Sequence, residues 1–293
     1  IRQLHTYGLL NGAFRPNADF LPLRAFRRQR KMLVECAADH IRHMQKAMDL
    51  MNVKLHLVIS DIIGVTGMRI IRSILAGKTQ PKELAQLRER NCQSSEEDFV
   101  KALTGNYRDE HLFALKQAVE LFDLYQQKIA ECDEKTAAAL DTFEKKNDPA
   151  KLPKKTRQKR RKNQLHFDAR PLLYQIAGVD LTATDGLDSS SVLTILAETG
   201  TDTSPWRTAD DFASWLALVP NRWITGGKPI AKKPPVIRPN RAAQAFRLAA
   251  QTLERAQCGV GAFFRRIQSR HGRSAAIKAT AHKLAVIFYS MLK

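Results

Sequence analysis

A heptad repeat between residues 108 and 145 limits the possible folds of this chain more than any other part of its sequence. At 1.5 Å per residue, an unbroken helix over these 38 residues would be about 57 Å long. Gln126, Asp133 and Thr136 are the polar exceptions in the repeat. The apolar residues at its a and d positions are Leu112, Leu115, Val119, Phe122, Ile129, Leu140 and Phe143.

A second long helix is predicted from Pro22 to Asn52, where apolar residues recur at steps of three and four. The two helices together predict an antiparallel coiled-coil arm or a dimer contact between chains, and packing within one domain is an equal alternative. Another helical stretch is predicted from Leu57 to Leu75, weakened by Gly64 and Gly67, and a short helix begins at Pro81.

The charge of the chain points to an anionic partner. Its 293 residues are 44% hydrophobic, enough for two domains, and its net charge is +19. From Val219 to Lys293 there are fifteen Lys or Arg residues and one acid, Glu254. This imbalance favours nucleic acid as the partner, although a basic ribosome-associated or merely soluble protein is an alternative.

Two further patterns indicate where the protein works. The four cysteines are scattered without metal-ligand spacing, which favours a reducing cytosol and no structural zinc. The apolar run from Val53 to Ala76 is interrupted by charged residues, so it is predicted to be a core helix, with no membrane partner. The predicted location is therefore cytoplasmic and, for a DNA-binding protein, nucleoid-associated.

A basic segment follows the heptad between residues 147 and 163. Pro149, Pro153 and a run of cations make this segment unable to bury itself. A phosphate clamp is the preferred interpretation, and a nuclear-localisation signal is the alternative. The cations are Lys154, Lys155, Arg157, Lys159, Arg160 and Arg161.

The region from residue 166 begins with a helix, a glycine turn and a second helix. The helices are predicted at 170–176 and 189–199, joined through Ala177-Gly-Val-Asp180. This order is similar to a helix-hairpin-helix, whose turn amides can hold a DNA phosphate. Asp180 stands where such a turn usually has its second glycine, which weakens the phosphate interpretation.

A Pro- and Gly-rich loop from Pro220 to Pro239 carries Ile224-Thr-Gly-Gly-Lys228. A hydroxyl among cations suits phosphodiester chemistry, so Thr225 is the candidate nucleophile, and an ordinary turn is the alternative. Three helices are predicted after the loop, at 240–256, 259–270 and 274–292. The candidate phosphate-binding residues of this region are Arg222, Gly226, Gly227, Lys228, Arg238, Arg241, Arg265, Arg266 and Arg270.

These segments, in this order and spacing, resemble the C-terminal domain of DEDD-type insertion-sequence transposases of insertion-sequence family one-hundred-ten, the Piv-like group. The similarity covers residues 172–293 closely and extends upstream through 5–10, 14–16 and 44–48. The matching segments are Gly178-Val-Asp180, Leu193 to Gly200, Ser204-Pro-Trp206, Phe212 to Leu216, Gly226-Gly-Lys228, Asn240 to Ala243, Gly261 to Arg266 and Ala279 to Leu284.

The resemblance implies a DNA recombinase. In that family an N-terminal RuvC-like domain binds Mg²⁺ through four carboxylates, and a serine in the C-terminal domain attacks the DNA backbone. A structured bridge RNA selects the DNA, and the protein works as an oligomer, here a homodimer or homotetramer through the coiled coil. The metal-binding carboxylates are expected before Ile1, so this chain alone is expected to bind no metal and to be inactive. Thr225 stands where the family has serine.

The sequence therefore predicts a mainly α-helical protein: a long antiparallel coiled-coil arm followed by a helical, helix-hairpin-helix-like transposase domain. A remnant of the RuvC-like domain is expected at 1–20 and the coiled-coil region at 21–146. The basic linker is expected at 147–165 and the C-terminal transposase domain at 166–293.

Overall fold

A computed structural model describes residues 3, 6–7, 14–154, 162–219, 224–225, 228–229 and 240–293. The described residues are mainly helical, and they form two compact units. One unit comprises residues 29–132, and the other comprises residues 1–28 together with 133–293. The two longest helices of the N-terminal half, α2 (Phe20–Leu50) and α6 (Asp109–Asp141), each contribute to both units.

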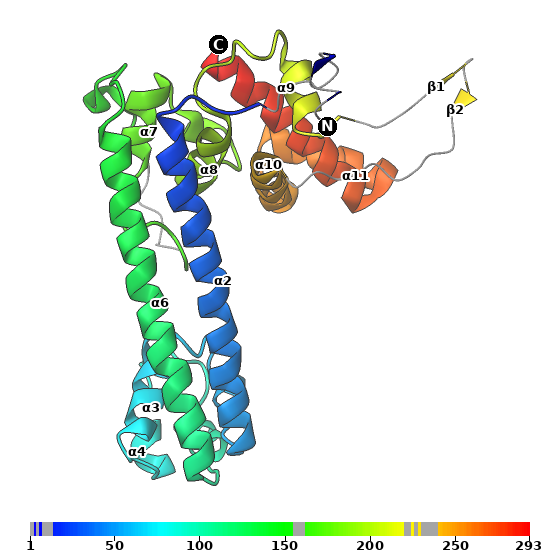
Figure 1. Cartoon of the computed structure of the whole chain (residues 1–293). Coiled ribbons are helices and arrows are strands. Elements are labelled where there is room, and N and C mark those ends of the chain that lie inside the picture. Colours follow the sequence, from blue (N-terminus) through cyan, green and yellow to red (C-terminus); the bar gives the residue numbers. More distant parts are fainter. Residues whose placement is uncertain are drawn as a thin grey trace. The chain divides into compact units, whose positions relative to one another are not determined.

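Within the 29–132 unit, α2 and α6 lie side by side and run in opposite directions (Figure 1). The predicted heptad explains their packing. Five of its apolar residues are buried, and Leu112 and Phe143 are half-buried. The apolar stripe predicted for the first helix is also buried at Leu33, Met44 and Met48. Between α2 and α6 the chain forms η1 (Leu55–Leu57), α3 (Val65–Leu75), α4 (Pro81–Ala85) and α5 (Glu96–Ala102).

The helix expected from Leu57 to Leu75 is shorter than predicted. α3 begins only at Val65, after Gly64 in an extended conformation. The reason lies in Gly67, where a Cβ atom would come 2.1 Å from the carbonyl oxygen of Ile62. Because Gly67 has no Cβ atom, the preceding loop can pack closely against the first turn of α3, and it does not extend the helix.

The larger unit contains α7 (Arg170–Ala177), α8 (Ser189–Thr199) and α9 (Ala209–Trp215). Their ends follow the sequence signals closely. Gly178 and Gly200, with φ of 81° and 71°, close α7 and α8. Thr208 caps α9 through a reciprocal capping box with Asp211. The short 3₁₀ turns η2 (Pro149–Lys151) and η3 (Leu181–Ala183) lie on either side of α7 in sequence.

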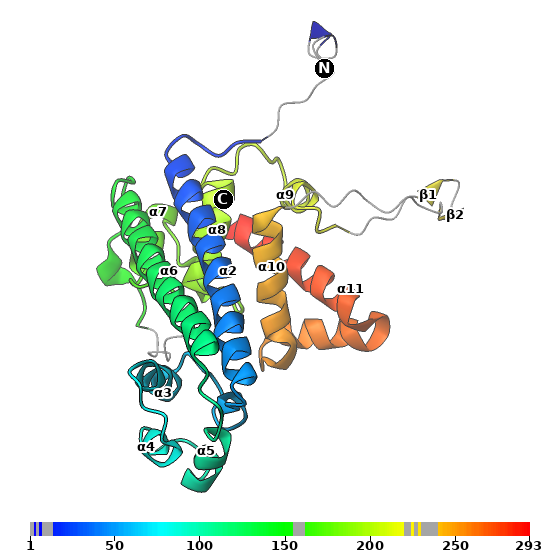
Figure 2. The same ribbon diagram turned by 60° about the horizontal axis from the view of Figure 1, so that its bottom comes forward.

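The last three helical segments complete this unit. α10 (Arg241–Thr252), capped by Asn240, leads through η4 (Leu253–Arg255) into α11 (Gly259–Leu292). Gly272 interrupts α11 with φ 80° and ψ 170°, so α11 consists of two helices that meet at a bend, as predicted (Figure 2). Phe246 of α10 and Phe288 of α11 are fully buried and in edge-to-face contact.

Buried charged residues tie distant segments of this unit together. The Glu198 carboxylate in α8 pairs with Arg24 at 2.9 Å and Arg28 at 2.8 Å, both in the first turns of α2. Asp133, a polar exception in the heptad, is 1% exposed and accepts from the backbone N–H of His166 at 3.2 Å. A buried carboxylate with such partners is satisfied, so a polar residue at a heptad core position does not break α6.

The compact units do not divide where the sequence predicted domains. The predicted boundaries at 20/21, 146/147 and 165/166 all lie inside the larger unit, which takes in both sides of the basic segment. The physical reason is the shared core: Phe20 and Leu140 belong to the same buried cluster as Leu173 and Phe288.

Candidate nucleic-acid interface

The candidate nucleophile lies in a two-stranded ladder. β1 (Ile224–Thr225) pairs with β2 (Lys228–Pro229) in antiparallel register, with Thr225 opposite Lys228 and Ile224 opposite Pro229. This register leaves a two-residue Gly-Gly connection, the sequence that a tight hairpin prefers. The backbone therefore places the hydroxyl-bearing residue and a basic residue at paired positions. Arg222, Gly226, Gly227 and Arg238 lie outside the described residues.

The basic segment after η2 is described only at its flanks. Lys154 is exposed, and Lys155, Arg157, Lys159, Arg160 and Arg161 lie outside the described residues. Before the segment, the Lys146 backbone N–H donates to the Gln175 carbonyl at 2.8 Å. After it, the His166 Nδ1 atom lies 3.2 Å from the Asp133 carboxylate. Both flanks are therefore held against the same unit.

The helices α10 and α11 present exposed cations. Arg241, Arg266 and Arg270, three of the predicted phosphate-binding residues, are exposed and form no ion pair with any residue that the structure describes. Arg266 and Arg270 are one helical turn apart, so their like charges repel at a cost of about 0.2–0.5 kcal/mol. Arg241 begins α10, where the helix dipole also disfavours a cation. These positions are unfavourable for the isolated fold and favourable for binding an anion.

Arg265 has a different environment from its neighbour Arg266. It is half-buried, and its Nη1 atom donates to the carbonyl oxygens of Ala256 at 2.8 Å and Glu254 at 3.2 Å. This guanidinium therefore satisfies the carbonyl groups at the end of η4. Of the predicted phosphate-binding residues Arg265, Arg266 and Arg270, the last two are exposed.

Glu254, the single acid between residues 240 and 293, is already occupied. Gln268 donates to its Oε1 atom at 2.8 Å, and Arg273 donates to its Oε2 atom at 3.0 Å. The hydrogen bond from Gln268, followed by that from Arg273, lowers the pKa of the Glu254 carboxyl. This carboxylate therefore neutralises Arg273 and leaves Arg266 and Arg270 without a counter-charge in this part of the chain.

The helix–turn–helix formed by α7 and α8 contains an internal ion pair. Arg170 Nη2 lies 2.6 Å from the Asp180 carboxylate, and Asp180 also accepts from the backbone N–H of Thr182 at 3.1 Å. Burial raises the pKa of Asp180, but the hydrogen bonds from Arg170 and Thr182 together outweigh it, so the pKa lies below its usual value. The Asp180 carboxylate therefore already accepts hydrogen bonds from donors of this turn that would be needed to bind a phosphate.

Trp206 and Trp215 pack against each other and against Phe14 in the larger unit. The ring of Trp206 is 7% exposed and contacts Phe14, Phe212 and Trp215 at centroid distances of 4.6, 4.9 and 5.1 Å. Trp223 lies outside the described residues. Among the described residues, no three His, Cys, Asp or Glu side chains are arranged to hold a metal ion.

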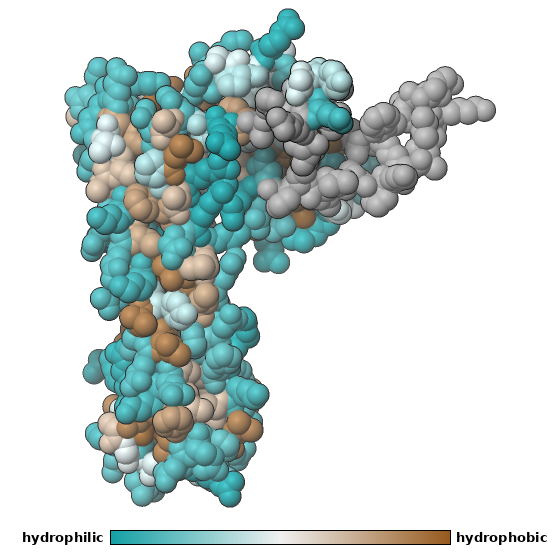
Figure 3. Space-filling model, viewed as in Figure 1, coloured by the Kyte–Doolittle hydropathy of each residue, from teal (hydrophilic) through white to brown (hydrophobic). Residues whose placement is uncertain are grey.

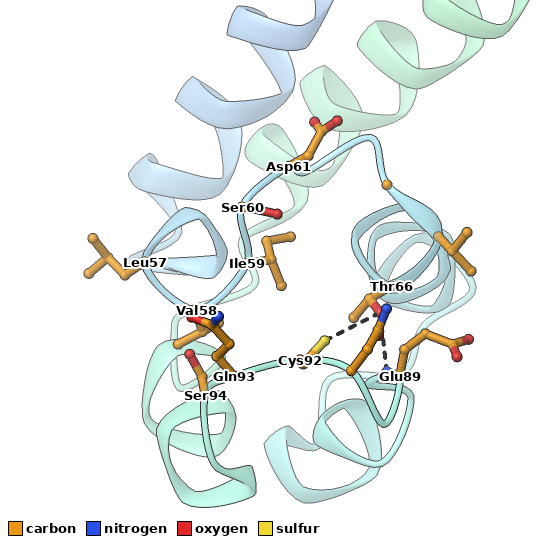
Figure 4. Close-up of a pocket in the computed structure, with 13 residues that line it drawn as sticks. Leu57, Val58, Ile59, Ser60, Asp61, Thr66, Glu89, Cys92, Gln93 and Ser94 are labelled. Carbon is orange, nitrogen blue, oxygen red and sulfur yellow. Dashed lines mark hydrogen bonds between the residues drawn. The ribbon is translucent and has the colours of Figure 1, made fainter. Parts of the chain in front are cut away.

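A cavity of about 790 Å³ lies in the 29–132 unit, between the loop before α3 and the loop before α5 (Figure 4). The hydroxyl of Thr66 accepts from the Glu89 backbone N–H at 3.2 Å and lies 3.7 Å from the Cys92 sulfur. The Glu89 carboxylate pairs with Arg69 at 2.9 Å. None of the residues predicted from the sequence to be functional lines this cavity.

No protein-family model matches the chain, and no curated protein is significantly similar to it. Within the described parts of the chain, no helix has the length and apolar character required to cross a bilayer.

Proposed function

We propose that this chain is the nucleic-acid-binding, nucleophile-bearing part of a DNA transposase or recombinase that is guided by a structured RNA. The observation that carries this proposal is the group of exposed cations on α10 and α11. Arg241, Arg266 and Arg270 form no ion pair with a described residue, and the single acid between residues 240 and 293, Glu254, is engaged by Gln268 and Arg273. A polyphosphate backbone is the abundant cellular anion that neutralises such a surface. The proposed location is the cytoplasm, in association with the nucleoid.

The proposed chemistry is phosphoryl transfer to Thr225. Its hydroxyl oxygen bonds to a DNA phosphorus, the bond between that phosphorus and one deoxyribose oxygen breaks, and the departing oxygen takes up a proton. A second DNA end then reverses the exchange and releases the threonine. Lys228, paired with Thr225 in the ladder, is suited to neutralise the charge that develops on the phosphate oxygens. The Mg²⁺ that such a reaction uses is assigned, by the sequence resemblance, to carboxylates outside this chain.

The helix-hairpin-helix-like element is part of the same proposal. α7, the left-handed Gly178 and α8 have the order of such an element. The Asp180 carboxylate makes this turn a weak phosphate site. The main contacts with the nucleic-acid backbone are therefore assigned to α10 and α11.

A covalent adduct between protein and DNA tests the catalytic proposal. The full-length protein is incubated with guide RNA, DNA and Mg²⁺, and products are separated under denaturing conditions. Thr225→Ala is expected to reduce the adduct below detection. Thr225→Ser is expected to retain it, because serine keeps the hydroxyl and removes the methyl that restricts χ1. Thr79→Ala, which removes a hydroxyl from the 29–132 unit, is the matched control and is expected to leave the adduct unchanged.

A non-catalytic nucleic-acid-binding and dimerisation module is the second candidate. It is favoured by an apolar stripe on α6, where Phe113, Leu121 and Leu124 are 63%, 41% and 46% exposed. Figure 3 shows brown, hydrophobic surface over this helix. The stripe lies on the face of α6 opposite the buried heptad, and a coiled coil with a second copy would cover it. An adduct that survives Thr225→Ala would remove the nucleophile assignment. DNA binding with no adduct from any variant would favour the module.

A further inference from the structure

Phe263, in the first half of α11, is an aromatic residue in an unusual environment. It is half-buried, yet it belongs to neither apolar cluster of the described residues and contacts no other aromatic ring there. Its neighbour Phe264 is fully buried. Because adjacent residues on a helix differ by about 100° in direction, Phe263 lies at the edge of the buried face.

The ring of Phe263 is contacted by two cations. The Lys283 ammonium lies 4.7 Å from the ring centroid, and the Arg266 guanidinium lies 5.6 Å from it. Both distances are within the range of a cation–π interaction. Lys283 and Arg266 are exposed, and neither forms an ion pair with a residue that the structure describes.

The bend at Gly272 creates this arrangement. In a straight helix, Phe263 and Lys283 would be about 30 Å apart along the axis. With φ 80° and ψ 170°, Gly272 has a backbone conformation that is almost exclusive to glycine, and it turns the second half of α11 back toward the first (Figure 2). The contact therefore depends on the fold and not on proximity in sequence.

We propose that Phe263 stacks on an unpaired base of a bound nucleic acid, while Arg266 and Lys283 hold the phosphates on either side of that base. The proposal rests on the nucleic-acid binding proposed above and specifies its mode. An unpaired base offers a free π-face, whereas a base inside a duplex has its faces covered by its neighbours. The aromatic ring is suited to bind the base of a single-stranded nucleotide, and the adjacent cations are suited to bind its phosphates.

The two cations leave room for such a ligand. Their side chains are long, flexible and exposed, so either can leave the ring for a phosphate when a base takes its place. Arg270, one turn beyond Arg266 and also exposed, extends the positive surface along the same helix. A strand that follows this surface would meet one aromatic ring among several cations, the usual composition of a single-strand site.

Fluorescence anisotropy with labelled oligonucleotides tests the proposal on the full-length protein. The probes are a twelve-residue oligothymidylate, the same strand with abasic sites throughout, and a twelve-residue oligouridylate. Phe263→Ala is expected to weaken binding of the two strands with bases by about 5- to 150-fold. It is expected to change abasic-strand binding by less than about two-fold, because the phosphates are unchanged. Comparison of the two base-containing probes shows whether the unpaired base comes from DNA or from RNA.

Matched variants separate stacking from charge and from loss of folding. Phe263→Trp is expected to retain base-dependent binding, and Phe263→Leu, which keeps apolar bulk without a π-face, is expected to behave like the alanine variant. Arg266→Gln and Lys283→Gln are expected to weaken binding of all three probes, including the abasic strand. Leu248→Ala, a truncation of a 54% exposed residue on α10, is the surface control and should change nothing.

Two results would overturn the proposal in different ways. If the alanine and leucine variants bind oligothymidylate as tightly as the unchanged protein, the stacking role is wrong, and the proposed function remains. If the unchanged protein binds none of the strands and no duplex, the proposed function fails, and the stacking role fails with it. Circular dichroism of each variant checks that it is folded.

Discussion

The 29–132 unit and the segment from residue 240 to 293 differ in their balance of positive and negative charges. The first contains fifteen Lys or Arg residues and fourteen acids, and the second contains ten and one. In the first, exposed cations face carboxylates, as in Arg69–Glu89 at 2.9 Å and Arg72–Asp123 at 3.0 Å. In the second, the single acid, Glu254, forms a salt bridge with Arg273 at 3.0 Å. The first unit therefore has nearly as many acids as cations, whereas the second has a large excess of cations.

This contrast has an energetic meaning. Surface ion pairs of the kind seen in the 29–132 unit contribute about 0–1 kcal/mol each, so they keep the unit near neutrality without determining its stability. Uncompensated cations on α10 and α11 repel one another and reduce stability slightly. If the proposed binding of nucleic acid occurs, release of counterions from the polyanion would outweigh this small loss of stability.

The largest expected effect is on DNA affinity. Replacing Arg241, Arg266, Arg270 and Lys283 with glutamine is expected to weaken binding to duplex DNA by about 10²- to 10³-fold near 0.15 M salt. The slope of log affinity against log salt concentration should fall by about two to four, because each lost phosphate contact removes about 0.9. Affinity measured across a salt series checks both values.

The 29–132 unit supplies a control with the same change in charge. Lys46, Lys78, Lys82 and Arg90 are exposed, and replacing them with glutamine also removes four positive charges. This variant is expected to keep the salt slope of the unchanged protein. Equal losses in the two variants would mean that net charge alone drives binding, and the contrast between the regions would then have no functional meaning.

A smaller effect, on stability, is expected when the ion pair between Arg170 and Asp180 is broken. Asp180→Asn should lower the free energy of unfolding at pH 7 by about 1.5–3 kcal/mol, because Arg170 loses a charged hydrogen-bond partner. The pKa of Asp180 is lowered in the folded state, so its stabilising effect is full above its unfolded value of about 3.9. That effect is lost as pH falls through the folded-state pKa.

Urea unfolding at several pH values measures this difference. The gap between the unchanged protein and Asp180→Asn is expected to be constant near neutral pH and to close as pH falls below about 4. A gap that stays the same in acid would show that the charge of this carboxylate is not what stabilises the turn.

The smallest effect is expected for a paired surface cation in the 29–132 unit. Arg72 is 59% exposed, and Arg72→Gln should change the free energy of unfolding by no more than about 1 kcal/mol. High salt should reduce even this difference, and DNA affinity should not change. A loss above about 2 kcal/mol in a thermal or urea unfolding experiment would contradict the view that this pair only balances charge.

The helices were largely predictable from the sequence because their signals are local. The long helices α2 and α6, the start of α4 at Pro81 and the end of α8 at Thr199 lie close to the predicted positions. Separate helices were predicted at 259–270 and 274–292, and the structure has a bend at Gly272 between them.

Features that depend on contacts between distant residues were not predictable. Nothing local distinguishes Arg265, which caps η4, from Arg266, which is exposed. The contact of Asp133 with His166 and the approach of Lys283 to Phe263 join residues far apart in sequence. For the nucleophile, the sequence predicted a turn at Thr225, and the ladder with Lys228 adds the register that a pattern of residues does not specify.

The two flanks of the basic segment, at Lys146 and His166, are both anchored in the larger unit. Core residues from both sides of the segment, such as Leu140 and Leu173, pack in one cluster. A single break in the chain between these flanks would therefore leave two fragments that stay associated through this cluster, and the break would be visible only after denaturation.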